Sequence, residues 1–211
     1  MSISIINANE RHIIQLAKLL STTGYDIATD KYNTLKLDPI QYISEYKIKP
    51  SLPFIRVAVS DDKTDNVLGM LEAGRFSLIM SQNSHDHYHE NIKIIFSNVF
   101  EIYNKLIPES YHIFRFAVCS GSRNKGVGNI LFNYAETEAK NAKLDLLTIT
   151  VWNNQIDAIR FYLKRKMEIK ACFHISEKIP YQNLLYLEKN FTRNIINNYF
   201  ESKEYSNLNL I

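Results

Sequence analysis

The sequence has little of what marks several common protein classes. It contains only two cysteines, Cys119 and Cys172, which form no metal-binding or redox motif and favour a reducing compartment. No run approaches the ~18 apolar residues of a membrane-spanning helix, and residues 1–6 lack the basic flank and long apolar core of a signal peptide. These absences predict a cytoplasmic protein with no membrane partner.

The chain also lacks a strong charge of either sign. Its formal net charge is +3, and Lys and Arg are interleaved with Asp and Glu, so no nucleic-acid partner is expected. The tightest basic run, Lys164-Arg165-Lys166, is interpreted as a solvated helix end, with a role near a ligand's phosphate group as a second choice. With 211 residues, 45% of them hydrophobic, the chain can bury roughly 70% of its unfolded surface as one domain.

Glycine is scarce too, and two of the six glycines lie one residue apart. Gly126 and Gly128 follow a β-branched and aromatic run, Tyr111–Val118, and a helical pattern comes directly after them. Such a junction directs several backbone N–H groups and the positive end of the helix dipole at one point, which suits a phosphate. The nucleoside-triphosphate loop is excluded because Val127 and Gly128 stand where it needs Lys and Ser/Thr. The dinucleotide fingerprint is excluded because Leu131 replaces its third glycine.

The motif that remains is Arg123-x-x-Gly126-x-Gly128, and it resembles the acyl-CoA pyrophosphate loop of the GNAT (Gcn5-related) N-acetyltransferases. A second segment is similar to the helix that follows in that family, Asn-x-x-Ala-x-x-(apolar)-Tyr-x-x-x-Gly-Phe. The matching residues are Ala158, Phe161 and Tyr162. Gln155 occupies the Asn position, with Asn154 beside it, and Lys166-Met167 replaces Gly-Phe. These departures concern helix capping and packing more than chemistry.

The resemblance implies a site and a reaction. A primary amine would attack the thioester of acetyl-CoA directly, and Tyr162 would protonate the departing sulfur as general acid. The backbone N–H of Val118 would polarise the carbonyl, and the fourth and fifth strands would splay so that pantetheine pairs with the fourth. The residues expected at the cofactor are Phe116, Ala117, Val118, Arg123, Asn124, Lys125, Gly126, Val127, Gly128, Asn129, Asn154 and Gln155. No metal is implied.

The general base is the least defined part of this prediction. The fourth strand offers Arg115 but no carboxylate, so Glu72 on the preceding strand is the first candidate and His112 the second. A surface position is the favoured alternative for both, and a water chain needs no side chain at all. His85, His87 and His89 lie close together with carboxylates, but alternate histidines in a polar run are interpreted as a solvated loop rather than a metal site.

The order of predicted elements is that of an α/β (α+β) GNAT fold, with a mixed sheet of about seven strands flanked by helices. Strands are expected at residues 3–7, 54–60, 67–79, 111–118, 146–151, 169–175 and 184–188. Helices are expected from Asn9, from Asp38-Pro39, over residues 90–106, from Gly128 to Asn141 and around Tyr162. The acetyltransferase domain would span residues 1–189, with a helical insertion at 80–110 and a tail from 190 to 211.

Residues 90–106 are expected to border the acceptor pocket, because long insertions in compact domains tend to be lids or partner surfaces. The expected function is N-acetyl (acyl) transfer from acetyl-CoA to a small-molecule or peptide amine. The alternative is a catalytically inactive GNAT-like module that binds acyl-CoA for regulation or interaction. The aromatic tail could pack against a second copy of the chain, which leaves a homodimer open.

Overall fold

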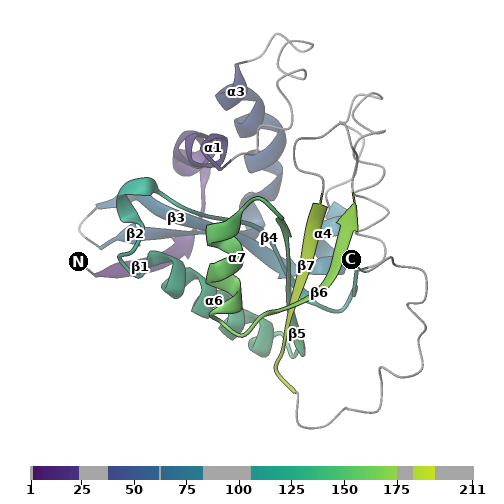
Figure 1. The fold of residues 1–211 in the computed structure, drawn as a ribbon. Coiled ribbons are helices and arrows are strands. Elements are labelled where there is room, and N and C mark those ends of the chain that lie inside the picture. Colours follow the sequence, from purple (N-terminus) through teal and green to yellow (C-terminus); the bar gives the residue numbers. More distant parts are fainter. Residues whose placement is uncertain (1, 24–37, 62, 83–105, 175–182, 193–211) are drawn as a thin grey trace.

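The centre of the molecule is a seven-stranded mixed sheet in the order β1-β2-β3-β4-β5-β7-β6 (Figure 1). The computed structural model describes residues 2–23, 38–61, 63–82, 106–174 and 183–192. The strands are β1 (Ile3–Asn7), β2 (Ile55–Ser60), β3 (Lys63–Arg75), β4 (Tyr111–Val118), β5 (Leu146–Trp152), β6 (Glu168–His174) and β7 (Asn183–Asn190). Only β4 and β5 pair in parallel. The predicted mixed sheet of about seven strands is therefore confirmed.

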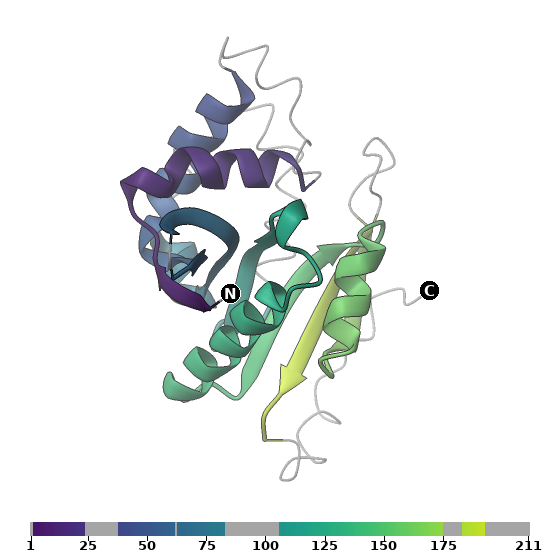
Figure 2. The ribbon, with the colours of Figure 1, turned by 90° about the vertical axis from the view of Figure 1, so that its left-hand side faces the viewer.

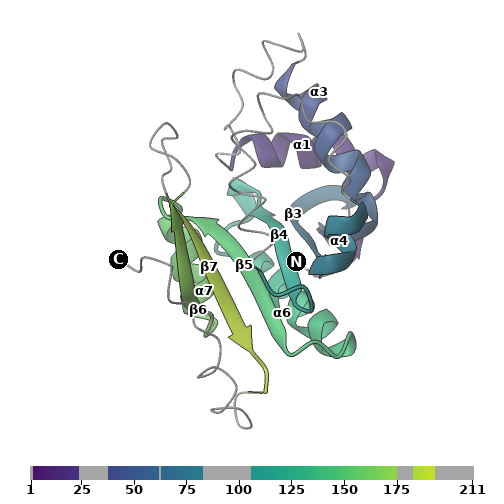
Figure 3. The same cartoon turned by 90° about the vertical axis from the view of Figure 1, so that its right-hand side faces the viewer.

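Helices cover both faces of this sheet (Figures 1, 2 and 3). One face carries α1 (Ile13–Ser21), α3 (Pro39–Ile43) and α4 (Phe76–Gln82), and the other carries α6 (Val127–Asn141) and α7 (Ile156–Leu163). Short turns of other helix types are η1 (Glu10–His12), η2 (Ser44–Ile48), η3 (Lys49–Phe54) and η5 (Ser120–Ser122). In the described parts of the chain, no helix has the length and apolar character needed to cross a membrane.

The first helices begin where the sequence predicts. The Asn9 side chain accepts a hydrogen bond from the Arg11 N–H, and the His12 ring accepts one from the Asn9 N–H, which together form a capping box. At α3 the Asp38 carboxylate accepts a hydrogen bond from the Ile40 N–H at 2.6 Å, and Pro39 fills the first helical turn. Both starts therefore depend on local polar contacts.

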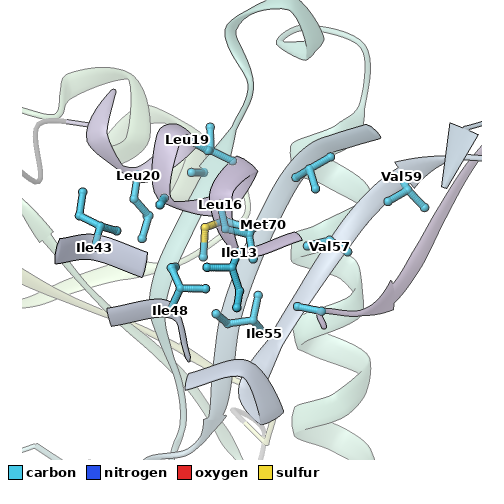
Figure 4. Packing of buried hydrophobic residues seen from close by; sticks show 14 of the residues in the cluster. Ile13, Leu16, Leu19, Leu20, Ile43, Ile48, Ile55, Val57, Val59 and Met70 are labelled. Atoms are coloured by element: carbon cyan, nitrogen blue, oxygen red, sulfur yellow. The ribbon is translucent and has the colours of Figure 1, made fainter. Parts of the chain in front are cut away.

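The apolar side of α1 packs on the β2–β3 part of the sheet (Figure 4). Ile13, Leu16 and Leu20 lie at helical spacing and are buried against Ile55 and Met70. A second cluster joins α6 and α7 to β4, β5 and β7 on the opposite face, and a third lies under α4. β4, the strand that leads into the glycine turn, contributes residues to clusters on both faces, Ala117 on one and Ile113 on the other.

One predicted strand is too long. Residues 76–79, expected to continue β3, form the start of α4 instead. The reason is that Arg75 pairs with Tyr111, the first residue of β4, so a longer β3 would have no strand to pair with. The N–H groups of Phe76 and Ser77 donate instead to the carbonyls of residues 110 and 108. The helix predicted at 90–106, except for Leu106, and the histidines at 85, 87 and 89 lie outside the described residues.

Candidate active site

The parallel pair β4–β5 opens into two separated strands. Their pairing runs only from Tyr111↔Leu147 to Ile113↔Ile149. Beyond it, β4 continues to Val118 and β5 to Trp152 without pairing to each other. We call these residues, 114–118 of β4 and 150–152 of β5, the β4–β5 splay. The splay that the family resemblance implies is thus confirmed in the backbone.

The backbone of β4 directs hydrogen-bonding groups into this splay. In an antiparallel ladder, opposite residues alternate between bonded and non-bonded pairs. The Cys119 N–H donates to the Leu68 carbonyl at 2.9 Å, so Ala117 forms the next bonded pair with β3. Phe116 and Val118 therefore direct their N–H and C=O groups away from β3, towards the β5 side. A ligand in the splay would find an unpaired strand edge there.

The turn after β4 presents further unpartnered amides. Within the described residues, the N–H groups of residues 124–129 donate to no other group. They surround the first turn of α6, which is 15 residues long and brings its positive dipole end to the same place. These are the residues predicted to hold a phosphate, Asn124, Lys125, Gly126, Val127, Gly128 and Asn129, and that role stays a prediction. The helix starts one residue earlier than predicted.

The two glycines of the turn serve different purposes. Gly126 has φ +85°, in the left-handed region that residues with a Cβ adopt at a cost, and no atom lies within 4 Å of where its Cβ would be. Gly128 has no such φ, but a Cβ there would come within 3.0 Å of the Phe161 ring. Gly126 is therefore required by the backbone conformation, and Gly128 by the close packing of α6 on α7.

Arg123 is exposed and lies over the end of β4. Its Nε donates to the Val118 carbonyl at 3.4 Å, so the guanidinium stands between the strand edge and the amide-rich turn. Lys125 is exposed in the same turn. Both cations are within a few residues of the α6 start, where they add positive charge to the amides. The predicted contact of these two side chains with the cofactor stays a prediction.

Tyr162 lies on α7 with its ring in an aromatic cluster. It is 3% exposed, and its ring contacts those of Phe116 on β4, Phe132 on α6 and Phe161, with centroids 5.4 to 6.2 Å apart. Burial raises the pKa of its phenol well above the usual range, although Arg165 acts in the opposite direction. The hydroxyl therefore holds its proton at neutral pH, on the face of β4 that also carries Phe116.

Arg165 shows that the basic run at 164–166 is more than a solvated helix end. Its guanidinium lies 3.4 Å from the centroid of the Phe161 ring and donates to the Phe161 carbonyl at 2.9 Å. Arg165 therefore packs the end of α7 against the aromatic cluster. Interpreting the whole run as solvated is therefore wrong for Arg165.

Gln155 occupies the N-cap position of α7 but makes no capping bond with its side chain. Its Nε2 instead donates to the carbonyl of Thr23, which follows α1, at 3.2 Å. Asn154 next to it is exposed. The sequence placed both near the cofactor, and the structure places both at the end of β5, beside the splay. The partner of Gln155 was not predictable, because 132 positions separate the two residues.

Glu72 and Arg115 form an ion pair on neighbouring strands, in which Glu72 is buried and Arg115 is partly buried. Glu72 is 1% exposed and lies opposite Arg115 in the β3–β4 register. Arg115 also donates to the Lys47 carbonyl at 3.0 Å, which connects the pair to η2. Burial raises the pKa of the Glu72 carboxyl and outweighs the opposite effect of Arg115. The favoured interpretation of Glu72 as a surface residue is wrong.

His112, the second candidate base, is fully buried as well, so the surface interpretation is wrong for it too. Its Nδ1 lies 2.8 Å from the Thr148 hydroxyl, and Thr148 lies 3.0 Å from the Ser110 hydroxyl. The ring packs edge-on against Phe76 and Phe114. Burial lowers the pKa of His112 to about 3, so the imidazole is neutral at pH 7. It lies one residue before the last paired position of β4.

Comparisons with known proteins agree with this geometry. The model of a family described as "Acetyltransferase (GNAT) family" matches residues 22–167. Among solved structures, an N-acetyltransferase from Staphylococcus aureus Mu50 is 13% identical, with TM-score 0.61, and covers 88% of this chain and 100% of its own. Ard1 from Thermoplasma volcanium is 14% identical, with TM-score 0.58, and covers 90% and 98%.

A third solved structure is Arabidopsis thaliana Naa50 in complex with the bisubstrate analogue CoA-Ac-MVNAL. It is 17% identical, with TM-score 0.54, and covers 90% of this chain and 100% of its own. At such identities the structural likeness establishes the fold alone. No curated protein matches the chain significantly.

Proposed function

We propose that this chain, which belongs to the GNAT acetyltransferase family, transfers an acetyl group from acetyl-CoA to a primary amine. The observation that carries the proposal is the coincidence of two features at the end of β4. One is the β4–β5 splay, where the edge of β4 at Phe116 and Val118 pairs with no strand among the described residues. The other is the turn at 124–129, whose amides have no partner in the described chain. Together they suit the pantetheine arm and the diphosphate of one ligand.

The residues of the site would divide the binding between them. The amides of 124–129 and the α6 dipole would hold the diphosphate oxygens, and Arg123 and Lys125 would add charge. Phe116 and Val118 would pair with the amide groups of pantetheine as a neighbouring strand does. This arrangement would bring the thioester carbonyl to the N–H of Val118, which acts as an oxyanion donor.

The reaction then needs a new N–C bond, the loss of the C–S bond, and one proton moved from nitrogen to sulfur overall. Tyr162 is the proposed general acid that supplies the proton to the sulfur. Its burial keeps the phenol protonated at neutral pH, and its ring adjoins Phe116 at the splay. Glu72 is the proposed general base, because burial raises its pKa towards the range that a base requires.

The amine acceptor is proposed by class. Several similar solved structures are described as N-acetyltransferases, and Naa50 was solved with an analogue that joins CoA to a peptide. This supports an amine nitrogen, of a small molecule or a peptide, as the acceptor. A cytosolic setting, where acetyl-CoA and free cysteine thiols coexist, remains the prediction from the cysteine content.

The test of the proposal is to combine the purified chain with acetyl-CoA and a panel of amines while measuring release of free thiol. We expect acetyl-CoA-dependent thiol release with at least one amine. Calorimetry with acetyl-CoA alone should detect binding. A chain that binds acetyl-CoA but releases no thiol with any amine would fit the inactive binding module instead. A chain that binds no acetyl-CoA at millimolar concentration would refute the proposal entirely.

The role of Tyr162 has its own test. Tyr162→Phe removes the hydroxyl but keeps the ring among Phe116, Phe132 and Phe161, so the fold should be retained. We expect kcat to fall roughly 10- to 1000-fold, with the Kd for acetyl-CoA nearly unchanged. Wild-type turnover in this variant would remove Tyr162 from the mechanism.

A further inference from the structure

The side chain of Gln155, at the start of α7, contacts the backbone that follows α1 at the open end of the splay. The Gln155 Nε2 donates to the Thr23 carbonyl at 3.2 Å, and we call this contact the Gln155–Thr23 bridge. A main-chain carbonyl can only accept, so the amide NH2 of Gln155 must face Thr23. In Figure 2, the end of α1 (purple) and the start of α7 (light green) lie at the same end of the sheet.

Both ends of the bridge are fixed by backbone hydrogen bonds. Thr23 donates its N–H to the Leu20 carbonyl at 3.0 Å, and its hydroxyl donates to the same carbonyl at 2.7 Å. Gln155 donates its N–H to the Trp152 carbonyl and accepts from the Ile159 N–H, each at 3.0 Å. The bridge therefore joins two ordered points rather than two loose loops.

The two points belong to clusters on opposite faces of the sheet. α1 packs in the cluster that contains Ala117 of β4 and the partly buried Cys119. α7 packs in the cluster that contains Val151 of β5, and Phe116 of β4 packs against the same cluster. Beyond Ile113 and Ile149, β4 and β5 do not pair with each other. The Gln155–Thr23 bridge therefore links the two clusters at the end of the sheet where the splay opens.

We propose that Gln155 is a positioning residue for acyl-CoA, which holds the end of α1 against the start of α7 and thereby encloses a pantetheine arm lying in the splay. This inference rests on the proposed function. Gln155 has the length that the contact requires, since an Asn at the same position would be one methylene shorter and Glu would have no proton to donate at neutral pH. A contact that closes the end of the splay over a bound arm is expected to act mainly by slowing ligand escape.

The test compares three substitutions, Gln155→Ala, Gln155→Asn and Gln155→Glu, with the wild type. We expect acetyl-CoA to dissociate three- to tenfold faster from each variant in stopped-flow measurements, with a smaller change in the association rate. The matched control is Asn133→Ala, which removes an exposed amide from α6 and should leave both rates unchanged. Hydrogen exchange in the ligand-free protein should be faster at the last turn of α1 in the three variants only.

The outcomes separate this inference from the proposed function. If the wild type binds acetyl-CoA and the variants dissociate it at the wild-type rate, the positioning role of Gln155 is refuted, whatever the exchange shows. If the exchange at the end of α1 is also unchanged, the bridge itself is absent in solution. If the wild type binds no acetyl-CoA, the proposed function fails and this role fails with it, while the exchange experiment still reports on the bridge.

Discussion

Two lysines occupy backbone positions that favour glycine, and replacing them should stabilise the protein. Lys143 after α6 has φ 55°, and Lys166 after α7 has φ 63°. In each case the residue that follows donates its N–H back across the last helical turn, Leu144 to Ala139 at 3.0 Å and Met167 to Tyr162 at 3.2 Å. This is the Schellman pattern, in which the left-handed residue is most often glycine.

The expected magnitude follows from two opposing terms. The left-handed conformation costs a residue with a Cβ roughly 1–2 kcal/mol, and glycine avoids this cost. Glycine also gives the unfolded chain more freedom, which takes back about 0.5–1 kcal/mol. Lys166→Gly and Lys143→Gly should therefore each raise the free energy of unfolding by about 0.5–1 kcal/mol. In a chain of this length that corresponds to roughly 1–4 °C in Tm.

Calorimetry and urea denaturation of both variants, and of the double variant, would test this. The two sites lie at the ends of different helices, so their effects should add. Lys18→Gly, at an exposed position inside α1, is the control with the opposite sign and should lose about 1 kcal/mol. Neutral or destabilising effects of Lys143→Gly and Lys166→Gly, beside the expected loss in Lys18→Gly, would show that the left-handed positions carry no strain.

Two further predictions follow from the packing of the site. Gly128→Ala should weaken acetyl-CoA binding and lower Tm, because its Cβ would come within 3.0 Å of the Phe161 ring, whereas Gly121→Ala meets no atom within 4 Å and should change neither. His112 has a pKa of about 3 when folded and about 6.5 when unfolded, so wild-type stability should be independent of this group above pH 6.5 and decline below it. From pH 6.5 to 4.5, His112→Asn should gain about 2.3 kcal/mol relative to wild type.

The junction from β4 to α6 could be predicted because its signals are local. A β-branched and aromatic strand, two glycines one residue apart and a helical pattern lie within 31 consecutive residues, from Tyr111 to Asn141. The same holds for the starts at Asn9 and Asp38, where the capping group and the helix are neighbours in sequence. Lys166 has the left-handed conformation that suits glycine, the residue that the family pattern has at this position.

The contacts that could not be predicted connect distant parts of the chain. Alternation on β3 places Glu72 on one face of the sheet, but its partner Arg115 depends on the register of β4, 43 positions away. The Gln155–Thr23 bridge depends on how α1 lies over the sheet. The end of β3 depends on where β4 begins, so residues 76–79 look like strand in sequence and form helix in the fold.

The pairing of Glu72 with Arg115 makes the role of the base testable. Glu72→Gln keeps the shape of the side chain but removes the buried carboxylate charge that faces the partly buried Arg115 guanidinium, so we expect a loss of about 3 kcal/mol in unfolding free energy. If Glu72 takes the proton from the amine, kcat of the folded variant should also fall, and the acidic limb of its pH–rate profile should disappear.

Glu109→Gln is the matched control, because Glu109 pairs with Arg75 at the surface and should change stability by less than about 1 kcal/mol. Activity is measured below the melting range of Glu72→Gln, so that the folded fraction is the same in all three proteins. A folded Glu72→Gln variant with the wild-type kcat and pH–rate profile would remove Glu72 from the chemistry. The ion pair would then be a structural link between β3, β4 and η2, since Arg115 also holds the Lys47 carbonyl.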